Sequence, residues 1–175
     1  MTSPSPPHAS SPGPDRLPLS PFHPAALIAT WLGSGLLPKM PGTWGSLAAL
    51  PFAAALAWAG GPWLLGAAAA VVFVIGIWAS ALYSRRLGLE DPGSVVVDEV
   101  AGQWLTLVPV AIASEFNIAY TLLGFLLFRL FDIVKPWPVN LADRKLKGGF
   151  GIMADDILAA VYAGAALAAF SWLLE

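Results

Sequence analysis

The sequence has no cysteine, few charges and only two histidines, and each shortage excludes a kind of chemistry. Without cysteine there is no disulfide, no thiolate nucleophile and no cysteine-ligated zinc. His8 and His23 both lie within the first 24 residues, so we expect no catalytic histidine in the folded part of the chain. Lysine and arginine number only nine in 175 residues, and the net charge is -2. We therefore expect no nucleic-acid partner, because such binding depends on clustered cations.

Apolar residues are in excess. The chain is 57% hydrophobic and 11% charged, whereas typical soluble domains have about 45–50% and about 25%. Such a composition excludes a disordered chain and favours a membrane protein. Residues 1–24 differ, because they hold eight of the sixteen prolines and few large apolar residues. We expect a flexible tail there, without the features of a secretory signal, followed by a single domain over residues 25–175.

Apolar segments follow the tail, and their alanine and leucine content and lack of two-residue alternation favour helices over strands. The sequence therefore predicts an all-α fold, a compact bundle of about six helices embedded in a membrane. Only residues 63–83 clearly reach the roughly 20 residues that cross a bilayer, and residues 157–174 are near the lower limit of about 17. The expected helices are residues 25–37, 47–59, 63–83, 100–113, 118–131 and 157–174.

The turns predict which loops share one end of the bundle. Short turns at residues 60–62 and 114–117 return the chain antiparallel, so the polar stretches 38–46, 84–99 and 132–156 are expected at the same end. Every lysine and arginine after the tail falls in or beside those stretches. In a membrane protein this bias places the polar end in the cytoplasm. A soluble bundle with a polar mouth would show the same pattern.

The first polar stretch contains Pro-Gly-Thr-Trp-Gly-Ser at residues 41–46, before an apolar segment. Thr43 or Ser46 is typical of a helix cap in this position. A second interpretation is a glycine-bearing loop, in which the backbone at Gly42 and the hydroxyl of Thr43 approach a phosphate at a helix N-terminus. The spacing is not that of a P-loop, since no Gly-Lys-Ser/Thr follows.

Acidic residues recur in the other two polar stretches. Asp98 and Glu99 stand at the start of an apolar segment, where a helix dipole favours them. Because adjacent helical residues point in different directions, we expect the two to divide tasks rather than chelate one ion together. Asp132 lies three residues from both Arg129 and Lys135, which is the spacing of an ordinary salt bridge in a last helical turn.

Asp155 and Asp156 begin the final apolar segment, where they are typical of capping residues. Together with the other acids, however, they would converge on one mouth of a protein that is otherwise poor in charge. Like charges gathered at low dielectric repel one another unless a cation joins them. Oxygen ligands without cysteine or usable histidine suit Mg²⁺ and not zinc. The seven converging acids are Glu90, Asp91, Asp98, Glu99, Asp132, Asp155 and Asp156.

The remaining chemistry is attack by water. The chain has no Asp-x-Asp motif, which argues against the usual aspartyl-phosphate phosphatases. Mg²⁺ commonly lies between one or two carboxylates and a substrate phosphate, where it activates water and neutralises phosphoryl oxygens. Arg129 and Lys135 would supply further positive charge.

With these motifs, the chain resembles the phosphatidylglycerophosphatase A family from about Gly33 to Gly164. Four ordered motifs carry the resemblance: Pro-Gly-Thr-Trp-Gly-Ser (41–46), Val-Val-Asp-Glu-x-x-Gly (96–102), Phe-Asp-x-x-Lys-Pro-Trp-Pro (131–138) and Gly-Gly-Phe-Gly-Ile-Met-x-Asp-Asp (148–156). The resemblance implies an all-helical, Mg²⁺-dependent phosphatase that converts phosphatidylglycerophosphate to phosphatidylglycerol at the inner face of a bacterial membrane. Gln103 departs from the pattern, in a place where a larger apolar residue is expected.

The resemblance also implies roles for individual residues. By this resemblance, the acidic centre of the site would consist of Asp98, Glu99, Asp132, Asp155 and Asp156. Lys135 and the loop around Thr43 would lie near the substrate phosphate. Some of the four aspartates would hold Mg²⁺, while Glu99 or a second aspartate takes a proton from the attacking water. The expected partners are the phospholipid substrate and the bilayer of the bacterial inner membrane. The alternative is a non-catalytic helical membrane protein whose acidic mouth binds metal.

Overall fold

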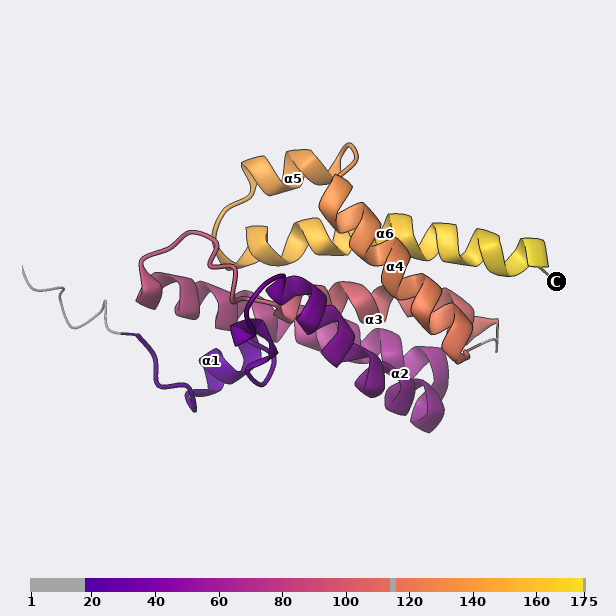
Figure 1. The fold of residues 1–175 in the computed structure, drawn as a ribbon, viewed down its shortest axis with the longest axis horizontal. Helices are drawn as coiled ribbons and strands as arrows, with labels where there is room; N and C mark the ends of the chain where they lie inside the picture. Colours follow the sequence, from indigo (N-terminus) through magenta and orange to yellow (C-terminus); the bar gives the residue numbers. More distant parts are fainter. Residues whose placement is uncertain (1–17, 114–115, 175) are drawn as a thin grey trace, which may run out of the picture.

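The structure, a computed structural model, describes residues 18–113 and 116–174, and these residues form helices and no strand. The all-α prediction is therefore confirmed. Most of the predicted tail lies outside the described residues, but Leu19 packs against the core. The elements, labelled in Figure 1, are α1 (Pro24–Ala29), a short 3-10 helix η2 (Ser34–Leu36), α2 (Pro41–Leu87), α3 (Val97–Ile112), α4 (Ile118–Val134), α5 (Val139–Lys145) and α6 (Gly148–Leu174).

The first predicted helix, residues 25–37, is wrong in its extent. α1 ends at Ala29, and the hydroxyl of Thr30 donates back to the carbonyl of Ala26 at 2.7 Å. The next residues, Trp31 and Leu32, have φ angles of 43° and 57°. Left-handed backbone cannot continue an α-helix, so the chain turns and forms only the 3-10 helix η2 before α2.

The predicted turn at residues 60–62 is confirmed within α2. Gly60 and Gly61 leave helical geometry, with φ angles of -152° and 63°. Glycine adopts a positive φ without steric cost, which allows a sharp reversal at Gly61. The two halves of α2 therefore form a helical hairpin, which runs out and back across the lower part of Figure 1.

The centre of the bundle is α3, which packs against α2, α4 and α6. Its apolar face contributes Val100, Trp104 and Leu107 to the core. The indole N–H of Trp104 donates to the carbonyl of Ala49 at 2.9 Å, which ties α3 to the first half of α2. Gln103, where an apolar residue is expected, is fully buried on this helix.

The polar end differs from prediction in two elements. The stretch 132–156 contains a helix, α5, which its short polar sequence does not signal. In addition, α6 begins at Gly148, so Asp155 and Asp156 lie two turns inside the helix and are not its caps. Figure 1 shows the start of α6 near the α2–α3 connection, at the end of the bundle away from the C-terminus.

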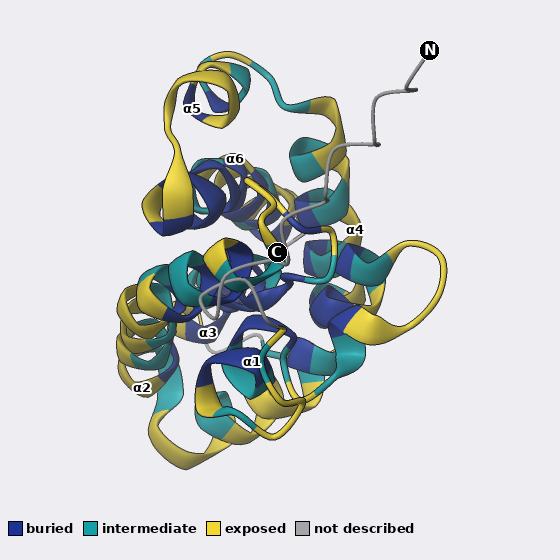
Figure 2. Cartoon of the chain, turned by 90° about the vertical axis from the view of Figure 1, so that its left-hand side faces the viewer, coloured by how far each residue is buried: buried dark blue, intermediate teal, exposed yellow. Residues whose placement is uncertain are grey.

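Two helices of the described chain, α2 and α6, are long and apolar enough to cross a membrane. Much of their apolar surface is exposed, as the outward face of α2 in Figure 2 illustrates. Trp58, Trp63 and Trp172, all near the end away from the polar loops, expose 91%, 83% and 76% of their surface. Such surfaces are typical of proteins that contact lipid, where tryptophan prefers the interface.

The close approach of α3 to α4 and α6 yields a stability prediction. A Cβ at Gly102 would lie 2.6 Å from the buried ring of Phe128 and 3.1 Å from the carbonyl of Asp156. We therefore expect Gly102→Ala to destabilise the fold by about 1–3 kcal/mol, as overpacking does. Gly66→Ala is the matched control, because its Cβ would meet only Val108 at 3.8 Å. Thermal unfolding in detergent should show a lower midpoint for Gly102→Ala alone, and equal midpoints would contradict this packing.

Candidate active site

A polar cavity of about 460 Å³ opens at this end of the bundle. Its lining comes from the start of α2, the α2–α3 connection, the first turn of α3, the last turns of α4, from α5, and from the residues around the start of α6. All seven predicted acids line it, together with Asp143. Against these eight acids the lining has three bases, Arg129, Lys135 and Lys147. The prediction that the three polar stretches converge is therefore confirmed.

Three of these acids form a tight group. One carboxylate oxygen from each of Asp98, Glu99 and Asp156 lies within 4.8 Å of the others. The carboxylates of Asp98 and Glu99 therefore do not point apart as expected, whereas the division of tasks between the two residues stays a prediction. The Cα–Cβ bonds of Asp98 and Glu99 point in different directions, but rotation about the further side-chain bonds brings both carboxylates toward Asp156 of α6.

The group has the chemistry of a cation site. Asp98 Oδ1, Glu99 Oε2 and Asp156 Oδ2 are buried and have no hydrogen-bond partner among the described residues. Burial, and then the negative charge of Glu99, raise the pKa of Asp98 well above its ordinary value. Burial likewise raises the pKa of Glu99 to about 8. Unpaired oxygens gathered in this way fit a hard divalent cation such as Mg²⁺, which takes oxygen ligands.

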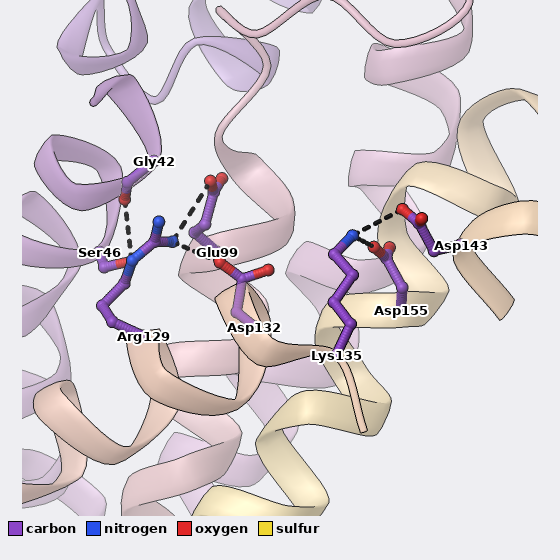
Figure 3. A network of polar contacts seen from close by, with 8 residues as sticks. All are labelled: Gly42, Ser46, Glu99, Arg129, Asp132, Lys135, Asp143 and Asp155. Atoms are coloured by element: carbon purple, nitrogen blue, oxygen red, sulfur yellow. Dashed lines mark hydrogen bonds and ion pairs between the residues drawn. The ribbon is translucent and has the colours of Figure 1, made fainter. Parts of the chain in front are cut away.

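Arg129 lies next to Glu99 of this group (Figure 3). Its Nη1 is 2.8 Å from Asp132 Oδ2, which confirms the salt bridge predicted for the last turns of α4. The same Nη1 is 3.7 Å from Glu99 Oε1. All three side chains are at most 15% exposed, so solvent screens these charges only weakly. Arg129 therefore balances Asp132 and orients Glu99.

Gly42 provides the space for this arrangement. A Cβ at Gly42 would collide with Glu99 Oε1 and lie 3.1 Å from Arg129 Nη1. The capping interpretation of this motif is wrong, because α2 already begins at Pro41 and its N-cap is Met40. The motif forms the first turns of this helix and not a loop, but Gly42 lies at the helix N-terminus and lines the cavity, so the approach of its backbone to a phosphate stays a prediction. Ser46 instead donates to the carbonyl of Gly42 at 2.9 Å, inside the helix (Figure 3). Thr43 does not line the cavity.

Lys135 forms a second charged cluster at the cavity wall (Figure 3). Its ammonium lies 2.6 Å from Asp143 Oδ1 and 2.5 Å from Asp155 Oδ2. Burial alone would lower the pKa of Lys135, but the hydrogen bonds to these two carboxylates outweigh it and raise that pKa. The spacing had suggested Asp132 as the partner of Lys135. The left-handed backbone of Lys135, with a φ of 45°, instead ends α4 and turns the side chain toward α5 and α6.

The structure thus divides the predicted site residues. Of the four aspartates expected to bind metal, Asp98 and Asp156 belong to the tight group, whereas Asp132 and Asp155 are paired with bases. Glu99 joins the group. Asp143 and Lys147 were missed, because neither belongs to a motif and only the folding of α5 and the start of α6 brings them to the cavity. At the mouth, Lys147 forms an exposed ion pair with Glu90 at 2.9 Å.

Comparison with known proteins supplies the family. The model of phosphatidylglycerophosphatase A matches residues 27–171. Phosphatidylglycerophosphatase A of Escherichia coli is 40% identical over 148 residues, covering 83% of this chain and 81% of that protein. The protein of the same name from Haemophilus influenzae is 39% identical over 145 residues, covering 83% and 85%.

A third relative differs in name. A Bacteroides thetaiotaomicron protein that is 39% identical over 158 residues, covering 85% of this chain and 94% of its own, bears the provisional name phosphatidylinositol-3-phosphatase. No solved structure matches the chain. The family match spans α1 to α6 and includes every element that contributes to the acidic cavity. The chain therefore belongs to the phosphatidylglycerophosphatase A family.

Proposed function

We propose that this protein is a Mg²⁺-dependent lipid phosphatase that hydrolyses phosphatidylglycerophosphate to phosphatidylglycerol and phosphate. The observation that carries the proposal is the group of three carboxylates, Asp98, Glu99 and Asp156, each with a buried oxygen that has no hydrogen-bond partner among the described residues, in an acidic cavity. The names of two relatives support the substrate. The non-catalytic alternative has less support, because the chain belongs to a family named for a phosphatase and is 40% identical to a named member.

The charge of the cavity explains why a cation is needed. Eight acids against three bases would repel a phosphate dianion. We propose that Asp98, Glu99 and Asp156 hold Mg²⁺. The ion would supply positive charge to phosphate oxygens and acidify water, as divalent ions do in phosphoryl transfer. Arg129 and Lys135, each oriented by its ion pairs, add positive charge at the edge of the site.

In the proposed hydrolysis, one phosphorus–oxygen bond forms and another breaks. Water attacks phosphorus while the bond from phosphorus to the terminal glycerol oxygen breaks. A carboxylate of the cavity accepts a proton from the attacking water and returns it to the leaving glycerol oxygen, so that phosphatidylglycerol and phosphate are released. The base is either Glu99, with Asp98 and Asp156 left to hold the ion, or a second aspartate of the cavity where Glu99 is a third ligand. Asp132 keeps Arg129 in place, and Asp155 does the same for Lys135.

We also propose that the protein lies in the bacterial inner membrane with its cavity toward the cytoplasm. Two exposed apolar helices support the membrane. The lysines and arginines after residue 24 lie in or beside the polar stretches at the cavity end, and the positive-inside tendency associates such an end with the cytoplasm. The lipid headgroup would then meet the acidic cavity at the membrane surface.

Phosphate release tests the reaction. We expect the purified protein in mixed micelles to release phosphate from phosphatidylglycerophosphate with Mg²⁺ and to lose that activity with excess EDTA, because the trio would then lack its cation. Phosphatidylinositol 3-phosphate and a soluble phosphomonoester are the comparison substrates. Faster turnover of the phosphoinositide would assign the activity named for the Bacteroides relative instead. No release from any substrate by folded protein would favour the non-catalytic alternative.

Removing one ligand oxygen tests the cation site. We expect Asp98→Asn and Asp156→Asn each to cut turnover by at least about 100-fold, since each loses a charge that holds the ion. Binding of Mn²⁺, measured by electron paramagnetic resonance as a probe of the Mg²⁺ site, should weaken in parallel. Asp143→Asn is the control for metal binding, because Asp143 is 41% exposed and pairs with Lys135. If both trio variants bind Mn²⁺ as tightly as the wild type, the assignment of the site is wrong.

Gly42 provides a test that leaves every charge in place. Gly42→Ala would push a methyl group against the carboxylate of Glu99. We therefore expect a loss of turnover of about 10-fold or more, with the unfolding midpoint close to wild type because Glu99 is a side chain that is able to move. Gly66 lies on the same helix, and a Cβ there would meet only Val108, at 3.8 Å. Gly66→Ala should therefore retain its activity. Equal activity of the two variants would show that the position of Glu99 is not critical.

A further inference from the structure

Gln103 is a buried polar side chain that the chemistry described above does not use. It lies on α3 and is fully buried. Neither its Nε2 nor its Oε1 has a hydrogen-bond partner among the residues that the structure describes. Burial of an amide without partners is costly, whereas methionine, which is also unbranched, would fill a similar space without that cost. An amide retained in this position therefore calls for a reason beyond packing.

The helix places Gln103 one turn beyond Glu99. The two residues are four positions apart on α3. Residues at this spacing lie on the same face of a helix, and the later side chain leans back toward the earlier one, because helical side chains point toward the N-terminus. Glutamine and acidic side chains at this spacing form hydrogen bonds on helices. Rotation about side-chain bonds is therefore sufficient to join this amide to the carboxylate of Glu99.

Glu99 has an acceptor that matches the amide. Its Oε1 lies 3.7 Å from Nη1 of Arg129. Its Oε2 is buried and, within the described part of the chain, has no hydrogen-bond partner. An amide N–H donates and a carboxylate oxygen accepts. One hydrogen bond would therefore satisfy two buried groups that otherwise each carry the cost of lost solvation.

We propose that Gln103 is a positioning residue of the cation site, and that its Nε2 donates to Oε2 of Glu99. This inference rests on the cation site of the proposed function, not on the hydrolysis. The hydrogen bond holds the carboxylate of Glu99 in the group that it forms with Asp98 and Asp156. Residues that orient a ligand in this way raise the affinity of a site for its metal without touching the ion. The carbonyl Oε1 is then free to accept from Nε of Arg129, a further buried donor without a partner in the described residues.

Removal of the amide tests this role. Gln103→Met keeps an unbranched side chain but has no N–H donor, and it should fold, because the family resemblance leads us to expect an apolar residue here. We expect the binding of Mn²⁺, measured by electron paramagnetic resonance, to weaken by about 10-fold, as is typical when a residue that orients a metal ligand is lost. Equal Mn²⁺ affinity of the variant and the wild type would overturn the inference.

Thr106→Val is the matched control for the loss of a buried polar group from the same helix. Thr106 is fully buried on α3, and its hydroxyl donates to the carbonyl of Gly102 at 2.9 Å. Because this hydroxyl already has a partner outside the acidic group, we expect Thr106→Val to bind Mn²⁺ as the wild type does. If Thr106→Val weakens binding as much as Gln103→Met, the effect is general to α3 and the positioning role is wrong.

A double variant separates positioning from a general loosening of the helix. If Gln103 acts through Glu99, then Gln103→Met should change Mn²⁺ affinity by less than about twofold once Glu99→Gln has removed the ionised carboxylate, since coupled residues are not additive. A structural role would weaken binding by the same factor with and without Glu99→Gln. Additive effects of the two substitutions would therefore overturn the inference even if Gln103→Met alone weakens binding.

The binding measurement does not depend on turnover, so the two proposals fail separately. Wild-type protein that binds Mn²⁺ in a Gln103-dependent way but releases no phosphate would refute the hydrolysis alone. Wild-type protein that binds Mn²⁺ and loses no affinity in Gln103→Met would refute the positioning role alone. Wild-type protein that binds no Mn²⁺ would overturn the cation site and, with it, the role of Gln103.

Discussion

The mutual repulsion of three carboxylates is the constraint on which the rest of this structure depends. Asp98 and Glu99 come from α3 and Asp156 from α6, and helix packing together with side-chain torsions brings one oxygen of each within 4.8 Å of the others. At an effective dielectric constant of about 20, each pair of ionised groups at that distance repels by about 3–4 kcal/mol. Without a cation, protonation relieves this cost, because burial and the neighbouring carboxylates raise the pKa of Asp98 well above its ordinary value and burial raises that of Glu99 to about 8. A bound divalent cation would reverse the sign of the interaction and stabilise the fold as well as the site.

The ion pairs of the cavity single out the place that we propose for that cation. Arg129 pairs with Asp132, and Lys135 pairs with Asp155 and Asp143. In the central group, Glu99 has only a longer contact of 3.7 Å with Arg129. Removal of Arg129 or Lys135 would leave further carboxylates of the same cavity without a basic partner. In the proposed site, the bases therefore act indirectly, by keeping these competing carboxylates away from the cation.

The sequence predicted the helical fold and the convergence of seven acids, because both follow from local patterns: apolar segments of helical length and short turns that reverse the chain. It did not predict which acids would meet. The divergence of Asp98 and Glu99 was argued from Cα–Cβ directions, whereas side-chain torsions decide the position of a carboxylate. The early start of α6 and the existence of α5 were also missed, because Gly148, Gly149 and a short polar segment carry no helical signal. Gly149 packs against the backbone of α2 at Ile77, so a tertiary contact favours helix where propensity does not.

The scarcity of charge in this chain becomes intelligible once its two kinds of surface are considered together. The start of α2 and the end of α4 border the acidic cavity, whereas much of the remaining surface of α2 and α6 exposes apolar side chains on helices long enough to cross a membrane. A charge on those apolar faces would lie without a partner in the proposed bilayer, which is costly. The proposed substrate, a phospholipid with a terminal phosphate, needs a polar site for the phosphate and apolar surroundings for its chains. Charge confined to one end of the bundle meets both needs, and the low overall charge of the sequence follows from it.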